Sequence, residues 1–97
     1  MKKVFISHPM HGKSSTKIIS EREKLADLAR EYTGQAVIIN GIDLENINVK
    51  SLEFISIAVE ALSQADIAVF GRGWQAAREC SILHECCSRY GVTVITE

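Results

Sequence analysis

Short apolar runs alternate along the chain with longer segments of mixed polarity. The runs lie at 3–7, 36–39, 66–70 and 92–95, and each is followed by glycine, proline or polar residues. Short runs that are almost wholly apolar are typical of strands buried on both faces of a sheet. The pattern therefore predicts four strands at these positions.

The three longer segments show the periodicity of amphipathic helices. The first begins after the N-cap candidates Ser14-Ser15-Thr16 and ends near Gly34, a residue that suits a C-terminal cap. The second helix extends to about Gln64, and the third covers 76–90. A polar connection, 40–50, separates the second strand from the second helix.

Strands and helices that alternate in this way predict an α/β fold. We expect a small three-layer Rossmann- or flavodoxin-like domain over residues 1–97, with a four-stranded parallel sheet and three helices. In open sheets of this kind, ligands bind beyond the carboxyl ends of the strands. The loops at that edge are 7–15, 40–50 and 71–78. Most of the polar, charged and aromatic side chains that could bind a ligand lie in them.

Composition and net charge indicate which classes of macromolecule the protein is not expected to bind. The chain has 97 residues, 46% of them hydrophobic, and a net charge of −1 with acidic and basic residues interspersed. Duplex nucleic acid and anionic membranes reward clustered Lys and Arg, so neither is an expected partner. No apolar run approaches the length of a bilayer span, and the start lacks the apolar core of a signal peptide. We expect a cytoplasmic protein.

The three cysteines fit that expectation. Cys80, Cys86 and Cys87 lie on one predicted helix at spacings that do not suit a disulfide. His84 beside Cys80 and Cys87 makes only a weak zinc pattern, because zinc sites use other spacings. We expect buried thiols, no bound metal and no cofactor.

The loop after the first strand offers many polar groups just before a helix. Its hydroxyl, imidazoles and ammonium, together with backbone amides at a helix start, suit a phosphate or another small anion. The plainer interpretation is a capped loop with solvated side chains. The candidate binding residues are Ser7, His8, Pro9, Met10, His11, Gly12 and Lys13.

The loop after the third strand places an aromatic ring and an acid together. Glu79 lies near a helix start, where the helix dipole stabilises a carboxylate, so it is either a nucleophile or merely favourable helix-start charge. Trp74 follows the Gly71-Arg72-Gly73 turn, and its ring either stacks on a base or packs on the helix below. Arg78 lies beside Glu79 as a further binding candidate.

Three further carboxylates are weaker candidates. Asp66 opens the third strand, where it either anchors a loop or caps the preceding turn. Asp43 and Glu45 lie in the polar connection, which cannot be placed from sequence. The glycines form neither GxGxxG nor a Walker sequence, so a dinucleotide site is not indicated.

Three segments resemble those of the nucleoside 2-deoxyribosyltransferase-like family. They are VFISHPMHG, ALSQADIAVFGRGWQAAREC and the closing GVTVI. The chain is especially similar to short phage and bacterial members with an "ISGPM-G" start and an "LPGW…GA..E" segment. The likeness covers the whole chain in order, and its most specific part is the series Asp66, Gly73-Trp74, Ala77 and Glu79.

The resemblance implies a parallel sheet, an activity and a set of roles. Relatives cleave or transfer the bond between a base and deoxyribose through a covalent glutamyl-sugar intermediate. By position, Glu79 matches the nucleophile and Asp66 a catalytic aspartate at the start of a strand. The loop from Ser7 to Gly12 matches the segment that meets the sugar or its 5′-phosphate. Relatives assemble as dimers or larger, so a homo-oligomer is implied.

Two departures from the family bear on catalysis. Relatives often have a tyrosine where this chain has Phe5, and an aspartate in the region matching 56–59, which has no acid here. We therefore carry three hypotheses. The first is N-glycosidase or deoxyribosyl transfer on 2′-deoxynucleosides or their 5′-monophosphates. The second is a module that binds a nucleotide or nucleotide signal without turnover, and the third is a structural domain.

Overall fold

The computed structural model describes residues 1–39 and 51–97, and it confirms the predicted α/β fold. The connection between them, with the candidates Asp43 and Glu45, lies outside the described residues. No helix in the described ranges is long and apolar enough to cross a membrane.

Four strands form one parallel sheet. They are β1 (Lys2–Ser7), β2 (Ala36–Ile39), β3 (Ile67–Phe70) and β4 (Thr93–Thr96), in the order β2-β1-β3-β4. All three pairings are parallel, and the register between the central strands places Ser7 beside Phe70. The carboxyl ends of β1 and β3 are therefore neighbours in space.

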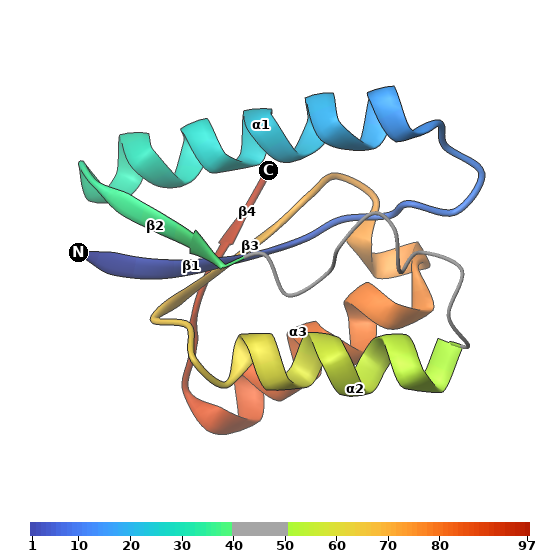
Figure 1. Ribbon diagram of the computed structural model, residues 1–97. Coiled ribbons are helices and arrows are strands. Elements are labelled where there is room, and N and C mark those ends of the chain that lie inside the picture. The colour runs from blue at the N-terminus through green and yellow to red at the C-terminus, as the bar shows by residue number, and fades with distance from the viewer. Residues whose placement is uncertain (40–50) are drawn as a thin grey trace.

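Three helices cover the sheet on both faces. They are α1 (Ser15–Thr33), α2 (Ser51–Leu62) and α3 (Arg78–Tyr90). In Figure 1, α1 lies on one face, while α2 and α3 lie on the other. The chain moves one way across the sheet from β1 to β2 and the opposite way from β2 to β3 and β4. Right-handed crossovers therefore place the first helix opposite the other two.

Side-chain alternation along the strands divides the interior into two cores. Val4 and Ile6 face α1, where they join a cluster with Leu25. Phe5 faces the other way, into a cluster with Phe70 and residues of α2 and α3. Because both faces are covered, the buried positions 4–6 of β1 and all four positions of β3 are apolar, as the sequence indicated.

The helix ends follow the expected capping residues, with small differences in extent. The Ser14 hydroxyl accepts a hydrogen bond from the backbone N–H of Lys17 at 3.2 Å, and the N–H of Gly34 donates to Arg30 at 2.7 Å. The third helix begins later than predicted, at Arg78. A short 3₁₀ helix, η2 (Trp74–Ala76), precedes it. Ala77 lies between the two helices and is extended, with φ −95° and ψ 118°, so they are not continuous.

Candidate functional site

A cavity of about 670 Å³ lies where the carboxyl ends of β1 and β3 meet. This is the topological switch point of the sheet, since the chain leaves β1 in one direction and β3 in the other. Open α/β sheets bind ligands at this position. The cavity is lined by the loop after β1, the start of α3 and parts of α1 and α2: Ile6, Ser7, His8, Pro9, Met10, His11, Gly12, Lys13, Arg22, Phe54, Ala76, Ala77, Arg78, Glu79 and Cys80.

Glu79 lines this cavity as the second residue of α3. Its side chain is 30% exposed, and its Oε1 accepts a hydrogen bond from Arg78 Nη2 at 3.0 Å. Partial burial raises the pKa of Glu79, but the Arg78 hydrogen bond, a backbone N–H and the charge of His11 together lower it below its ordinary value. The carboxylate is therefore ionised at neutral pH, in the same hollow as the loop after β1.

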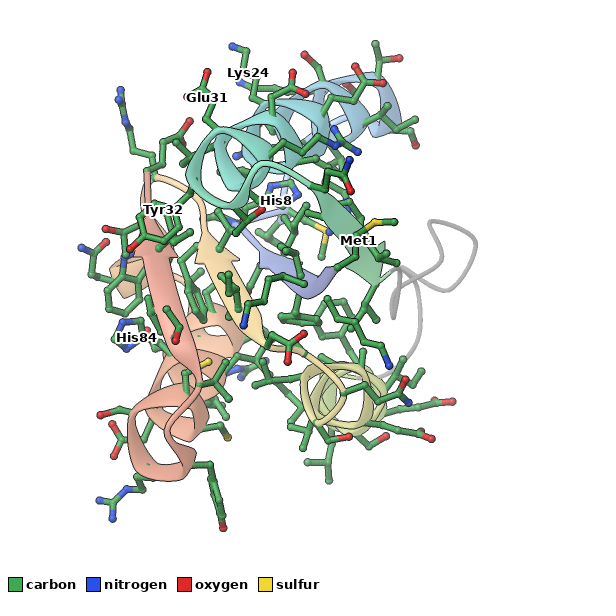
Figure 2. The ribbon with its side chains drawn as sticks, turned by 90° about the vertical axis from the view of Figure 1, so that its left-hand side faces the viewer. Met1, His8, Lys24, Glu31, Tyr32 and His84 are labelled. Carbon is green, nitrogen blue, oxygen red and sulfur yellow. The ribbon has the colours of Figure 1, made fainter. Side chains whose placement is uncertain are left out.

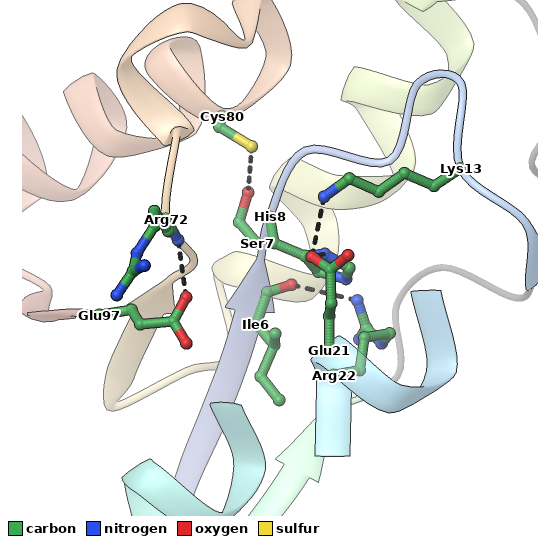
Figure 3. A network of polar contacts seen from close by, with 9 residues as sticks. All are labelled: Ile6, Ser7, His8, Lys13, Glu21, Arg22, Arg72, Cys80 and Glu97. Carbon is green, nitrogen blue, oxygen red and sulfur yellow. Dashed lines mark hydrogen bonds and ion pairs between the residues drawn. The ribbon is translucent and has the colours of Figure 1, made fainter. Parts of the chain in front are cut away.

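The end of β1 forms the wall beside α3. The Ser7 hydroxyl is buried and donates a hydrogen bond to Cys80 Sγ at 3.2 Å, which links β1 to the first turn of α3 (Figure 3). Burial raises the pKa of the Cys80 thiol, so it is protonated at neutral pH. The contact fixes the position of Ser7 rather than activating the thiol.

His8 is the most deeply buried polar residue of the site. Its side chain is only 1% exposed, and Figure 2 shows it in the interior between α1 and the sheet. Its Nδ1 lies 3.5 Å from Glu21 Oε2, and neither ring nitrogen has a hydrogen-bond partner. Burial, reinforced by the charge of Arg22, lowers the pKa of His8, so the imidazole is neutral near pH 7.

Charged side chains of α1 and of the loop after β1 lie around this imidazole. Lys13 Nζ pairs with Glu21 Oε2 at 2.8 Å, and an Arg22 guanidinium N–H points to the carbonyl oxygen of Ile6 at 3.5 Å (Figure 3). Partial burial raises the pKa of Glu21, but the hydrogen bond and charge of Lys13 outweigh it and lower the pKa. The site therefore contains a bound Lys–Glu pair with Arg22 beside it.

The remaining loop residues also line the cavity. A turn brings the backbone N–H of Lys13 to the carbonyl oxygen of Met10 at 3.2 Å. Gly12 within it has φ +76°, a left-handed conformation that favours glycine. The whole predicted segment from Ser7 to Lys13 thus meets Glu79 and Arg78 in one cavity.

Trp74, a candidate for stacking on a base, does not line this cavity. Its ring stacks on His84 with centroids 3.9 Å apart and planes 10° apart, and its centroid is 5.8 Å from that of Phe70. The neighbouring Gly73 does not line the cavity either; a Cβ there would come within 3.6 Å of Pro9 Cγ. Trp74 packs on α3, which was the plainer of the two interpretations.

Asp66 lies at the opposite end of the sheet, and this corrects its grouping with Glu79. Its Oδ2 accepts a hydrogen bond from the backbone N–H of Lys3 at 2.8 Å, and its own N–H donates to the carbonyl oxygen of Lys3 at 2.8 Å. Residues that open a parallel strand lie at its amino end, whereas the cavity lies beyond the carboxyl ends. Asp66 therefore joins β3 to β1, and the structure does not bring it to the site.

The predicted site residues omit several residues that line the cavity, among them the cation Arg22 and the aromatic Phe54. A signal existed for Arg22, because it occupies the apolar stripe of α1 between Ile18 and Leu25. A charged residue at such a position must find a polar environment. Phe54 lies near the start of α2, and helix starts in this fold lie at the ligand edge of the sheet.

Comparisons with known proteins add no relative to this description. Family models, curated proteins and solved structures were each compared with the chain, and none matched. Within residues 1–39 and 51–97, no cluster of three or more His, Cys, Asp or Glu side chains could hold a metal ion.

Proposed function

We propose that the chain cleaves or transfers the N-glycosidic bond of 2′-deoxynucleosides or their 5′-monophosphates, with Glu79 as nucleophile. One observation supports this most. Glu79 and the loop from Ser7 to Lys13 line the same cavity at the switch point of the sheet. Two of the three segments that resemble the nucleoside 2-deoxyribosyltransferase-like family contribute to this cavity: the first supplies residues 6–12 and the end of the second supplies residues 76–80.

The chemistry would proceed in two steps. A carboxylate oxygen of Glu79 attacks the anomeric carbon while the bond from that carbon to the base breaks, and the base departs with the electron pair and takes up a proton. Water or a second base then attacks the same carbon and restores the carboxylate. The lowered pKa of Glu79 favours this role because only the ionised form is nucleophilic.

The proposal includes a homo-oligomer, since members of the family that the chain resembles complete each site with a neighbouring subunit. Two positions set limits on the rate. Phe5 is 1% exposed within the core and has no hydroxyl, and Ala58 is fully buried in the region where relatives have an aspartate. The groups that orient the reacting centre in relatives are therefore missing, which lowers the expected turnover.

A second candidate function is nucleotide binding without turnover. It is favoured by Phe5 and Ala58 and by the Arg78–Glu79 ion pair. A carboxylate already held by a guanidinium is a weaker nucleophile, so the cavity would bind a nucleotide without turning it over. No nucleic-acid duplex or membrane partner is part of either proposal.

Release of free base distinguishes the enzyme from the binding module. Purified protein is incubated with each 2′-deoxynucleoside and each 5′-monophosphate, and free base is measured by chromatography. We expect release by the natural protein and a loss of about 10³-fold or more in Glu79→Gln, because removing a nucleophile removes the covalent step. Glu85→Gln is the matched control, since Glu85 lies on the same helix but is 61% exposed and paired with Arg89.

Each result has one meaning. Release that depends on Glu79 and not on Glu85 supports the enzyme. A ligand-induced rise in melting temperature without release supports the binding module. Release that persists in Glu79→Gln would overturn Glu79 as the nucleophile.

A further inference from the structure

We propose that the segment 8–13, which follows β1, is a pH-sensitive switch: it is closed against α1 while His8 is neutral, and it opens when His8 takes up a proton. All six residues of this segment line the cavity, so its opening would remove one wall. The change does not depend on whether the cavity turns its ligand over or only binds it.

Backbone hydrogen bonds fix the chain on both sides of this segment. Before it, the N–H of Gly71 donates to the carbonyl oxygen of Ser7 at 2.8 Å and holds the end of β1. After it, the N–H of Ile18 donates to the carbonyl oxygen of Ser14 at 3.0 Å, in the first turn of α1. The two ends therefore stay in place when the part between them moves.

Between these ends, few polar contacts hold the segment. The hydrogen bond from the Lys13 N–H to the Met10 carbonyl oxygen lies within the segment itself. Among the residues that the structure describes, its one side-chain hydrogen bond to a helix joins Lys13 Nζ to Glu21 Oε2 at 2.8 Å. Its most deeply buried side chain is that of His8, which is 1% exposed. The closed position thus depends mainly on one ion pair and one buried imidazole.

The imidazole of His8 lies among charges without a partner of its own. Neither ring nitrogen has a hydrogen-bond partner, and Nδ1 lies 3.5 Å from Glu21 Oε2 (Figure 3). In the described ranges, the charged side chains that face the ring are Glu21 and Arg22 of α1 and Lys13 of the segment itself. From the end of β3, Gly71 packs against His8 and has no side chain.

Uptake of a proton changes the charge of this cluster. With His8 neutral, Lys13 and Arg22 contribute two positive charges and Glu21 one negative charge, so the net charge is +1. With His8 protonated, the net charge is +2, and Glu21 is already bound to Lys13. A buried imidazolium without an anion of its own is costly. Protonation therefore favours a position of the segment in which the ring is in water.

The direction of the pH dependence follows from the two positions of the ring. In the open position the imidazole has the ordinary pKa of histidine, 6.5, whereas burial and the charge of Arg22 lower its pKa in the closed position. The open position therefore binds more protons, and lowering the pH below 6.5 favours it. Because an exposed histidine is mostly protonated at pH 5, the open-to-closed ratio should rise by about 5- to 30-fold between pH 7.5 and pH 5.

Hydrogen exchange followed by nuclear magnetic resonance measures this ratio, because a buried amide exchanges only while it is exposed. The reporter is the backbone N–H at position 8, since His8 as a whole is only 3% exposed. The N–H of Ala29, a fully buried residue of α1, reports global unfolding in the same sample. After correction for the intrinsic exchange rate, protection at position 8 should be far below that at Ala29. It should also fall by about 5- to 30-fold from pH 7.5 to pH 5.

Three variants of the cluster should give distinct results. His8→Gln takes up no proton, so its protection at position 8 should change by less than about 2-fold over this range. Arg22→Gln removes a positive charge near the ring, so the fall in protection should be smaller than in the natural protein. Glu21→Gln leaves Lys13 without its carboxylate, so protection should already be low at pH 7.5. Glu23→Gln is the matched control, because Glu23 is an exposed residue of the same helix and should give the results of the natural protein.

Equal protection at position 8 and at Ala29 would mean that the segment opens only when the whole chain unfolds, and it would overturn the switch. Protection at position 8 that is independent of pH, or that falls equally in His8→Gln, would overturn it as well. Circular dichroism at both pH values shows whether each variant is folded. If His8→Gln is unfolded, Arg22→Gln is compared with Glu23→Gln, and an equal pH dependence in these two proteins overturns the switch.

Discussion

At the scale of single residues, Gly71 and His8 lie so close that the space at one position limits the residue at the other. A Cβ added at Gly71 would lie 2.6 Å from His8 Cβ and 3.1 Å from Leu25 Cδ1. The first neighbour cannot move aside, because it is attached directly to a buried backbone. The absence of a side chain after β3 therefore makes room for the imidazole after β1.

A double-mutant cycle tests this fit. Gly71→Ala should lower the free energy of unfolding by about 1–3 kcal/mol, the usual cost of overpacking. In a His8→Gly background the Cβ that causes the clash is gone, so the same change should cost less by about 1 kcal/mol or more. Urea unfolding of the four proteins measures this. Equal costs in both backgrounds would show that the clash does not set the stability.

At the scale of elements, the ends of the helices decide what the loops present. The first turn of α3 presents Glu79 to the cavity because Ala77 remains extended and the helix begins only at Arg78. On the other side of the cavity, the second turn of α1 contributes Arg22 to the lining and Glu21 as the partner of Lys13. The position of those two side chains depends on where α1 begins.

The N-cap of α1 gives a prediction at this scale. Ser14→Ala removes the acceptor for the Lys17 N–H and should lower the free energy of unfolding by about 1 kcal/mol. Ser15→Ala is the control, since Ser15 is the exposed first residue of the helix and should change stability by less than about 0.5 kcal/mol. Thermal and urea unfolding measure both. A Ser14→Ala protein as stable as Ser15→Ala would mean that the cap does not hold the helix start.

At the scale of the whole molecule, α2 exposes two large apolar side chains on one face. Leu52 is 81% exposed and Val59 is 38% exposed, and residues seven apart lie on the same face of a helix. The proposed homo-oligomer would bury this face.

Sedimentation velocity tests the assembly. We expect a dimer or larger species for the natural chain, and a shift to monomer when Leu52→Glu and Val59→Glu are combined, because charges are costly in an apolar interface. Tyr90→Ser is the control, since Tyr90 is 83% exposed on α3 and its loss should leave the assembly unchanged. A natural protein that sediments as a monomer at every concentration contradicts the expectation.

The sequence by itself determined the elements of this protein and their order. Apolar runs mark the strands, periodic segments mark the helices, and Ser14 and Gly34 mark the ends of α1. These features are local, because they depend on which groups a short segment can bury or cap. For the same reason the position of Glu79 near a helix start was readable from the chain.

Only the tertiary structure decided which of these groups meet. The order β2-β1-β3-β4 brings the loops after β1 and β3 together, and the same order leaves Asp66 at the far end of the sheet. Trp74 stacks on His84, while Arg22 and Phe54 join the cavity. Such contacts depend on strand order and on the space between packed helices. Both are set by the whole chain folding around two cores, and no short segment contains that information.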